Sequence, residues 1–143
     1  MVSFFREYWP REETVGSCSG RRILLVDDDL FNLEVIGSIL AMSGAEVVTA
    51  KSGIEALRLL EADRAFDVVF LDVQMPGMDG CETARRIRRD ERLRDLPLVA
   101  VTANAVAGVR ERCLDAGMND FLTKPVDTPA LLDALSRWAG GRP

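Results

Sequence analysis

Short apolar runs alternate with helix-like patterns along most of this chain. Five runs have the length and composition of β-strands: residues 23–26, 46–50, 68–71, 97–101 and 120–123. After each run, apolar residues recur every three or four positions, which predicts five amphipathic α-helices. The run 68–71 is apolar without interruption, as is typical of a strand that is buried on both faces of a parallel sheet.

Local signals mark the ends of several helices. The expected N-caps are Asp29, Ser52, Asp79 and Thr128, the last followed by a first-turn proline. Gly117 has the position of a C-cap. Gly108 falls inside the helix that Val106, Val109 and Cys113 predict, where it should weaken the helix by about 1 kcal/mol relative to alanine. The third helix should present its arginines to solvent: Arg85, Arg86, Arg88 and Arg89.

The alternation of strands and helices predicts an α/β fold. Parallel strands joined by right-handed helical crossovers leave helices on both faces of a single sheet. For a doubly wound sheet of five strands we expect the flavodoxin-like order 2-1-3-4-5, which brings the first and third strands together. Ligands of such sheets bind at that point, outside the carboxyl ends of the strands.

Length and charge limit the classes to which this protein can belong. The 143 residues allow one well-buried domain, and we expect a tail or linker over residues 1–20 and the domain over 21–143. The net charge of −5 argues against binding to nucleic acid or to an anionic membrane, because both need a basic surface. No apolar run has the length of a membrane span, and residues 1–13 lack the apolar core of a signal peptide. We therefore expect a cytoplasmic protein.

The chain has no histidine and only three cysteines, Cys18, Cys81 and Cys113. This composition excludes Ser-His-Asp and Cys-His catalysis, and it leaves zinc without its usual ligands. We expect Cys81 and Cys113 to be small apolar residues of helices, and Cys18 to be a free thiol in the tail.

Polar residues follow four of the five predicted strands. Asp27 and Asp28 follow the first, Asp72 the third, Thr102 the fourth and Lys124 the fifth. Two carboxylates about 4 Å apart repel each other by roughly 4 kcal/mol at an effective dielectric of about 20, so three of them together call for a cation. Oxygen ligands without histidine or cysteine favour Mg²⁺.

The same group of residues suits phosphoryl transfer. The transition state of this reaction spreads negative charge over several oxygens, and a dication, an ammonium and a hydroxyl would stabilise that charge. Carboxylates are known covalent acceptors of phosphate, so we interpret Asp72 as the nucleophile. Taken alone, Asp72 could begin a turn and Lys124 could be a surface lysine, but their coincidence with the other residues favours a site.

Four segments carry a family resemblance. In their order and spacing, ILLVDDD, VFLDVQMPGMDG, LVAVTANA and DFLTKP resemble the receiver domains of two-component response regulators, over about residues 23–138. The stretch from TANA to DFLTKP is especially similar to receivers of hybrid sensor histidine kinases. The resemblance implies a phosphoacceptor domain of a two-component or phosphorelay pathway, which catalyses only its own phosphorylation and dephosphorylation.

The resemblance also implies how the acids and the metal work together. Asp72 would accept a phosphoryl group from a phosphohistidine of a histidine kinase or a histidine phosphotransfer protein. Asp28, Asp72 and the backbone carbonyl of Gln74 would bind Mg²⁺ directly, and Asp27 would act mainly through water.

Two further residues complete the site that the resemblance implies, and a third forms the switch. Thr102 and Lys124 would contact the phosphoryl oxygens, and Phe121 matches the aromatic switch position of the family. After phosphorylation, Thr102 would move toward the new oxygens and Phe121 would fill the vacated space. The surface of the fourth helix, fifth strand and fifth helix would then change, and a homodimer through this face is a further option.

Two other functions fit part of the sequence. A phosphohydrolase that uses an aspartyl-phosphate would carry a second acid two residues after the nucleophile, where this chain has Gln74. A binding module with an inactive site would have lost some of the acidic, hydroxyl or lysine positions, and all of them are present.

Overall fold

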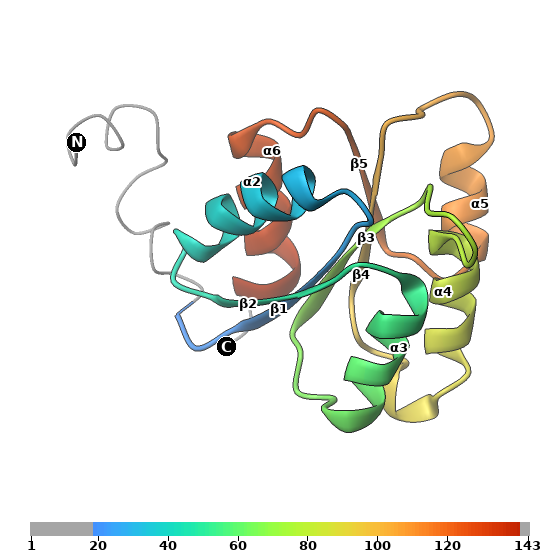
Figure 1. Ribbon diagram of the computed structural model, residues 1–143, viewed down its shortest axis with the longest axis horizontal. Helices are drawn as coiled ribbons and strands as arrows, with labels where there is room; N and C mark the ends of the chain where they lie inside the picture. Colours follow the sequence, from blue (N-terminus) through green and yellow to red (C-terminus); the bar gives the residue numbers. More distant parts are fainter. Residues whose placement is uncertain (1–18, 141–143) are drawn as a thin grey trace.

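The computed structural model describes residues 19–140, and Figure 1 labels their elements, beginning with helix α2. The strands are β1 (Arg22–Val26), β2 (Glu46–Ala50), β3 (Val68–Asp72), β4 (Leu98–Thr102) and β5 (Asp120–Thr123). The helices are α2 (Leu30–Ala41), α3 (Gly53–Ala62), α4 (Gly80–Arg88), α5 (Val109–Asp115) and α6 (Thr128–Leu135). Two short helical turns are η1 (Glu91–Leu93) and η2 (Ser136–Gly140).

The five strands form one parallel sheet in the order β2-β1-β3-β4-β5, which confirms the predicted fold and strand order. In the central pair, Val26 of β1 lies opposite Leu71 of β3. The next residues, Asp27 and Asp72, are therefore neighbours at the carboxyl edge of the sheet. The strand order thus places two acids at the predicted ligand position.

Helices cover both faces of the sheet (Figure 1): α2 and α6 lie on one face, and α3, α4 and α5 on the other. Alternate residues of each strand enter two separate hydrophobic cores. In β1, Ile23 and Leu25 pack on the side of α2 and α6, whereas Leu24 and Val26 pack on the side of α3, α4 and α5. The central strands are apolar without a break because neither of their faces meets water.

Side-chain caps begin most of the helices. The predicted N-caps of α2, α3 and α4 are confirmed, since each accepts a backbone N–H of the first turn: Asp29, Ser52 and Asp79. The predicted cap of α6 is wrong by one residue. Asp127 caps this helix instead of Thr128, because its carboxylate accepts the N–H of Ala130 at 2.7 Å.

Helix α5 begins later than predicted. Gly108 precedes it with a φ of 93°, a left-handed conformation that glycine adopts without steric strain. Val106 lies outside the helix and is exposed. The expected weakening of a helix interior by Gly108 was therefore wrong, because this glycine forms the turn that leads into α5. Gly117, at a φ of 103°, follows the end of α5 as predicted.

The arginines of α4 are not all on a solvent-facing surface. Arg85, Arg86 and Arg89 are exposed as predicted. Arg88 is half-buried, and its guanidinium donates hydrogen bonds to the carbonyl oxygens of Leu93 and Gly117. The prediction for Arg88 was wrong because this side chain binds backbone carbonyl groups outside α4. Every residue type has such a carbonyl, so the residue pattern does not reveal these contacts.

The expected tail over residues 1–20, with Cys18, lies outside the described residues except for its last two positions. Within residues 19–140, Cys81 and Cys113 are buried on α4 and α5 as predicted. No helix of this part of the chain is long and apolar enough to cross a membrane.

Candidate functional site

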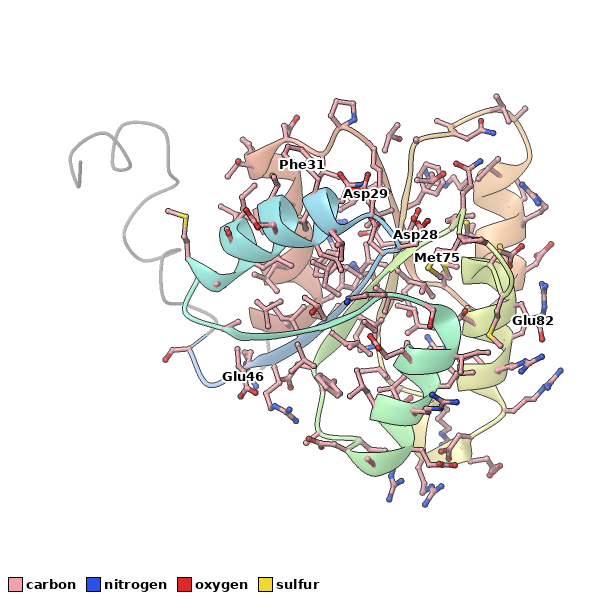
Figure 2. The ribbon with its side chains drawn as sticks, in the orientation of Figure 1. Asp28, Asp29, Phe31, Glu46, Met75 and Glu82 are labelled. Carbon is pink, nitrogen blue, oxygen red and sulfur yellow. The ribbon has the colours of Figure 1, made fainter. Side chains whose placement is uncertain are left out.

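Three aspartates meet at the carboxyl edge of the sheet, where β1 and β3 end. Asp27 and Asp72 are almost completely buried, with 2% and 4% of their surface exposed, whereas Asp28 is exposed. One carboxylate oxygen from each of the three lies within 4.8 Å of the others. Figure 2 shows Asp28 at this edge, together with Met75 of the loop that follows β3.

This acidic cluster has the chemistry of a site for a hard dication. Three carboxylates offer oxygen ligands, and these are the ligands that Mg²⁺ prefers. Gln74 lies in the loop next to the cluster, and its N–H donates a 3.3 Å hydrogen bond to Oδ1 of Asp72. Asp29 does not belong to the cluster in function, because its carboxylate caps α2.

Lys124 brings a positive charge to the same acids. It follows β5 directly, and its Nζ lies 2.9 Å from Oδ2 of Asp27 and 3.4 Å from Oδ1 of Asp72. Burial lowers the pKa of Lys124, but the hydrogen bond to Asp27 and the charge of Asp72 outweigh it, so the pKa is raised above its ordinary value. The lysine is therefore fully charged at neutral pH. The peptide bond between Lys124 and Pro125 is cis.

The carboxyl group of Asp72 is the perturbed acid of the site. Burial, together with the negative charge of Asp27, raises its pKa from an ordinary 3.8 to about 6. The ammonium of Lys124 and the N–H of Gln74 offset part of this increase. A buried acid with a raised pKa next to a fixed cation is typical of a functional group.

Thr102 ends β4 at the same edge and is completely buried. Its hydroxyl oxygen accepts the N–H of Asn104 at 3.0 Å and lies 3.3 Å from the carbonyl oxygen of that residue. The hydroxyl is thus engaged with the backbone of the loop that follows β4. Phe121 of β5 is half-buried and packs against the core on the side of α3, α4 and α5.

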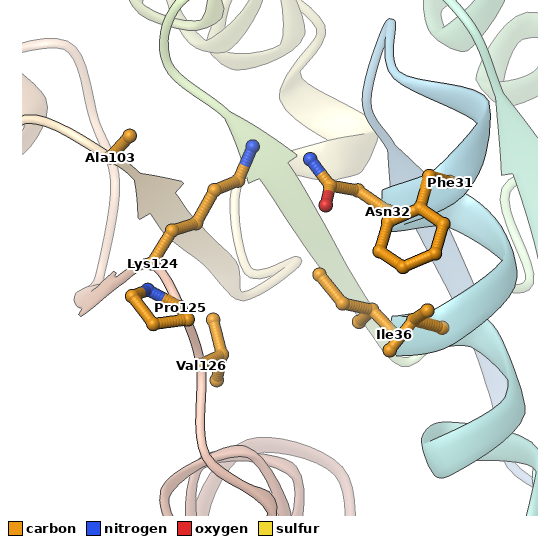
Figure 3. A pocket seen from close by; sticks show the side chains of 8 residues that line it. Phe31, Asn32, Ile36, Ala103, Lys124, Pro125 and Val126 are labelled. Atoms are coloured by element: carbon orange, nitrogen blue, oxygen red, sulfur yellow. The ribbon is translucent and has the colours of Figure 1, made fainter.

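A pocket of about 320 Å³ adjoins Lys124 (Figure 3). The amide group of Asn32 and the ammonium of Lys124 point into it from opposite sides. Most of the remaining lining is apolar and comes from the start of α2 and from the segments after β4 and β5: Phe31, Val35, Ile36, Ala103, Pro125 and Val126.

Helix α2 carries exposed apolar residues that were not among the predicted site residues. Leu30, Phe31 and Val35 are all exposed, and Phe31 retains 72% of its surface. A signal for them was present, because these three apolar residues lie off the inward stripe of Leu33 and Ile36. Contiguous exposed apolar surface is a common feature of interaction sites.

The match to a protein family covers most of the chain. The model of the response regulator receiver domain matches residues 23–136. The chain belongs to this family. This receiver domain has curated relatives among sensor kinases, which confirms the predicted likeness to hybrid sensor histidine kinases.

Two of these relatives come from bacteria. Sensor protein GacS of Pseudomonas syringae pv. syringae is 42% identical over 122 residues, which are 83% of this chain. Sensor histidine kinase RcsC of Salmonella typhi is 40% identical over 128 residues, which are 90% of this chain. In each case the receiver domain spans only 13% of the relative's length.

Solved receiver domains share the fold. The receiver domain of sensor histidine kinase PA1611 from Pseudomonas aeruginosa PAO1, with a magnesium ion coordinated in its active site cleft, is 42% identical with a TM-score of 0.78. That match covers 84% of this chain and 98% of the other. The receiver domain of Ssk1 from Saccharomyces cerevisiae, in complex with the phosphotransfer protein Ypd1, is 29% identical with a TM-score of 0.76. That match covers 83% of this chain and 88% of the other.

Proposed function

We propose that this receiver domain accepts a phosphoryl group on Asp72 from a phosphohistidine of a partner protein, with Mg²⁺ as cofactor. The proposal rests mainly on the charged groups that surround Asp72. Its carboxylate is buried, yet it lies beside the ammonium of Lys124 and the carboxylates of Asp27 and Asp28. Such a site can neutralise the negative charge of a transferring phosphoryl group.

In the proposed step, a carboxylate oxygen of Asp72 forms a bond to phosphorus while the bond from phosphorus to the imidazole nitrogen of the donor breaks. The electron pair of that bond stays on the nitrogen. The products are an acyl phosphate on Asp72 and a free histidine on the donor. Attack of water on phosphorus later returns the carboxylate and releases inorganic phosphate.

We assign the metal ligands as Asp28, Asp72 and the backbone carbonyl of Gln74, with Asp27 acting through water. The clustered carboxylate oxygens support this assignment, as does the magnesium ion in the similar PA1611 receiver domain. When bound, the ion supplies positive charge to the transferring oxygens. Lys124, at the carboxyl end of β5, supplies a second positive charge.

We propose that the phosphohistidine protein docks on the apolar surface of α2 beside the pocket of Figure 3. Phe31 and Val35 are exposed there, and Lys124 lies at the inner end of the same pocket. A partner helix on this surface would bring its histidine toward Asp72. The complex of the similar Ssk1 receiver domain with Ypd1 supports a histidine phosphotransfer protein as the occupant, or the corresponding domain of a histidine kinase.

We further propose that phosphorylation switches the surface of α5, β5 and α6. A phosphoryl group adds about −1.5 to −2 charges, which would attract the hydroxyl of Thr102 away from Asn104. Phe121 would then move into the space that Thr102 leaves, and the start of α5 at Gly108 would follow. This face is the one through which an output partner or a second copy of the chain would bind.

A cytoplasmic location belongs to the same proposal. Cys81 and Cys113 are neighbouring free thiols in the core, as expected for a reducing compartment. We expect no direct contacts with nucleic acid or a membrane, because the net charge of −5 would oppose them.

Incubation with acetyl phosphate and Mg²⁺, followed by intact mass measurement, tests the function. A receiver domain gains one phosphoryl group that alkaline hydroxylamine removes. A binding module with an inactive site gains none, and a phosphohydrolase would turn over small phosphate esters. Either of the last two results would overturn the proposal.

The docking surface has a matched pair of variants. Phe31→Ser should slow phosphotransfer from a phosphorylated histidine phosphotransfer protein but leave phosphorylation by acetyl phosphate unchanged. Ile54→Ser removes a comparably exposed apolar side chain from α3 and should affect neither reaction. Equal rates of protein phosphotransfer in the two variants would contradict the assignment of α2.

A further inference from the structure

Arg88 connects α4 to two other parts of the chain. From α4, its Nε donates to the carbonyl oxygen of Gly117 at 2.9 Å. One terminal nitrogen donates to the carbonyl oxygen of Leu93 at 2.8 Å, and the other donates to Oδ1 of Asn119 at 2.8 Å. Together with a longer bond of 3.3 Å to the carbonyl oxygen of Arg94, these bonds hold the planar guanidinium in one place, which a lysine could not reproduce.

The turn between α5 and β5 is built around this side chain. A Cβ atom on Gly117 would lie 2.6 Å from Cγ of Arg88, closer than carbon atoms can approach. The φ of 103° at Gly117 is also a conformation that glycine favours. The position of the Arg88 side chain therefore requires a glycine at residue 117.

Asn119 links the guanidinium of Arg88 to the first residue of β4. Its Oδ1 accepts both a guanidinium N–H of Arg88 and the backbone N–H of Leu98, each at 2.8 Å. Its own N–H donates to the carbonyl oxygen of Leu98 at 2.7 Å. Asn119 thus binds both backbone groups of the first residue of β4 and sets the register of the strand that follows.

That register decides where Lys124 lies. Strand β5 has only four residues and a single neighbour, β4, so few ladder hydrogen bonds fix it. Lys124 follows immediately, and its N–H donates to the carbonyl oxygen of Thr102 at 2.7 Å. A slip by one residue would turn the side chains of β5 to the opposite faces and would move Lys124 away from the acids.

We propose that Arg88 is a positioning residue for Lys124: with Asn119, it fixes the start of β5 and thereby the approach of the ammonium to Asp72. The inference rests on the proposed function, in which Lys124 contacts the phosphoryl group. It assigns to α4 a role at the site although Arg88 touches none of the site residues.

The test compares Arg88→Met with Arg88→Lys and with Arg89→Ala, which removes an exposed arginine of the same helix. At saturating Mg²⁺, Arg88→Met should be phosphorylated by acetyl phosphate about tenfold more slowly than wild type, because a misplaced ammonium of Lys124 would stabilise the transferring phosphoryl group less well. Mg²⁺ affinity, measured by calorimetry, should stay the same or increase, because Lys124 is not a metal ligand. Arg88→Lys should recover part of the rate, and Arg89→Ala should match wild type.

Amide hydrogen exchange provides a second measurement that does not depend on phosphorylation. In Arg88→Met, exchange should become faster in β5 while the amides of β1 and β3 keep their protection. Unchanged exchange in β5, or a phosphorylation rate within about twofold of Arg89→Ala, would overturn the positioning role. So would a parallel loss of Mg²⁺ affinity and rate, since this pattern indicates general damage. If wild type itself gained no phosphoryl group, the proposed function would be wrong. The exchange data would still test whether Arg88 holds the start of β5 in place.

Discussion

The ammonium of Lys124 donates a 2.9 Å hydrogen bond to Oδ2 of Asp27, which is 97 residues away in the chain. Asp27 is only 2% exposed and the side chain of Lys124 is 16% exposed, so water has limited access to this pair of charges. The same acid belongs to the cluster that we assign to Mg²⁺. Lys124 and a bound metal ion would therefore interact with the same group of carboxylates, and each positive charge would weaken the attraction of these carboxylates for the other.

Removal of the lysine charge should separate metal binding from phosphorylation. In Lys124→Gln we expect Mg²⁺ to bind about three- to tenfold more tightly, because a competing positive charge is gone from a partly buried site. Phosphorylation by acetyl phosphate should nevertheless slow strongly. Lys51→Gln is the matched control, because Lys51 is exposed and is the other lysine of the chain. Unchanged or weaker Mg²⁺ binding in Lys124→Gln, by calorimetry, would contradict the competition.

The raised pKa of Asp72 predicts how stability depends on pH. The folded protein holds the proton of Asp72 up to a pH of about 6, whereas an aspartate normally loses it near 3.8. The stabilising effect is therefore complete below pH 3.8 and is lost as the pH rises through 6. At pH 7.5 without divalent metal, Asp72→Asn should increase the free energy of unfolding by about 1–2 kcal/mol, and the gain should shrink toward pH 4.

Urea denaturation at the two pH values measures this difference. Asp115→Asn, an exposed change on α5, serves as the control and should show no comparable gain. If Asp72→Asn were less stable than wild type at pH 7.5, the folded protein would stabilise the ionised form of Asp72, which would contradict its raised pKa.

The hydroxyl of Thr102 should matter for switching more than for phosphorylation. Thr102→Ala removes the group that binds the backbone of Asn104 and that we expect to move toward the phosphoryl oxygens. Phosphorylation should still occur, but the changes in the NMR signals of α5 and Phe121 that follow it should disappear. Thr102→Ser keeps the hydroxyl and should keep the response. A full response in Thr102→Ala would remove Thr102 from the switch.

Two glycines should respond in opposite ways to alanine. At Gly80 a Cβ atom would lie 2.3 Å from the carbonyl oxygen of Asp72 and 2.7 Å from Cα of Val73, both parts of the backbone. Gly80→Ala should therefore destabilise the protein by about 1–3 kcal/mol and displace the end of β3. At Gly37 the nearest side chain is at an ordinary 3.7 Å, so Gly37→Ala should stabilise α2 by up to about 1 kcal/mol. Thermal unfolding checks both, and equal effects would contradict the close approach at Gly80.

The sheet and the ends of its strands could be predicted from the sequence because a strand buried on both faces is an apolar run that stops at a polar residue. Asp72 ends β3 in this way, and a parallel sheet brings such ends to one edge. The sequence therefore predicted which residues would converge. It did not indicate that Lys124 would bind Asp27 more closely than Asp72, since that depends on side-chain geometry.

The missed features depend on backbone geometry or on contacts between remote residues. The start of α5 depends on the left-handed conformation of Gly108, and a glycine in the sequence does not specify its φ. Arg88 resembles its exposed neighbours on α4, but it binds carbonyl groups of Leu93 and Gly117. Any residue type provides such a carbonyl, so no residue pattern could have indicated these contacts.

Mapping of the phosphoryl group by mass spectrometry tests the central claim most directly. Wild type, Asp72→Asn and Asp79→Asn, the last a change of the acid that caps α4, would be incubated with acetyl phosphate in Mg²⁺ and in EDTA. We predict one phosphoryl group, in the peptide that contains residue 72, on wild type and Asp79→Asn in Mg²⁺ alone. A phosphoryl group on Asp72→Asn, or one that forms equally well in EDTA, would contradict the account.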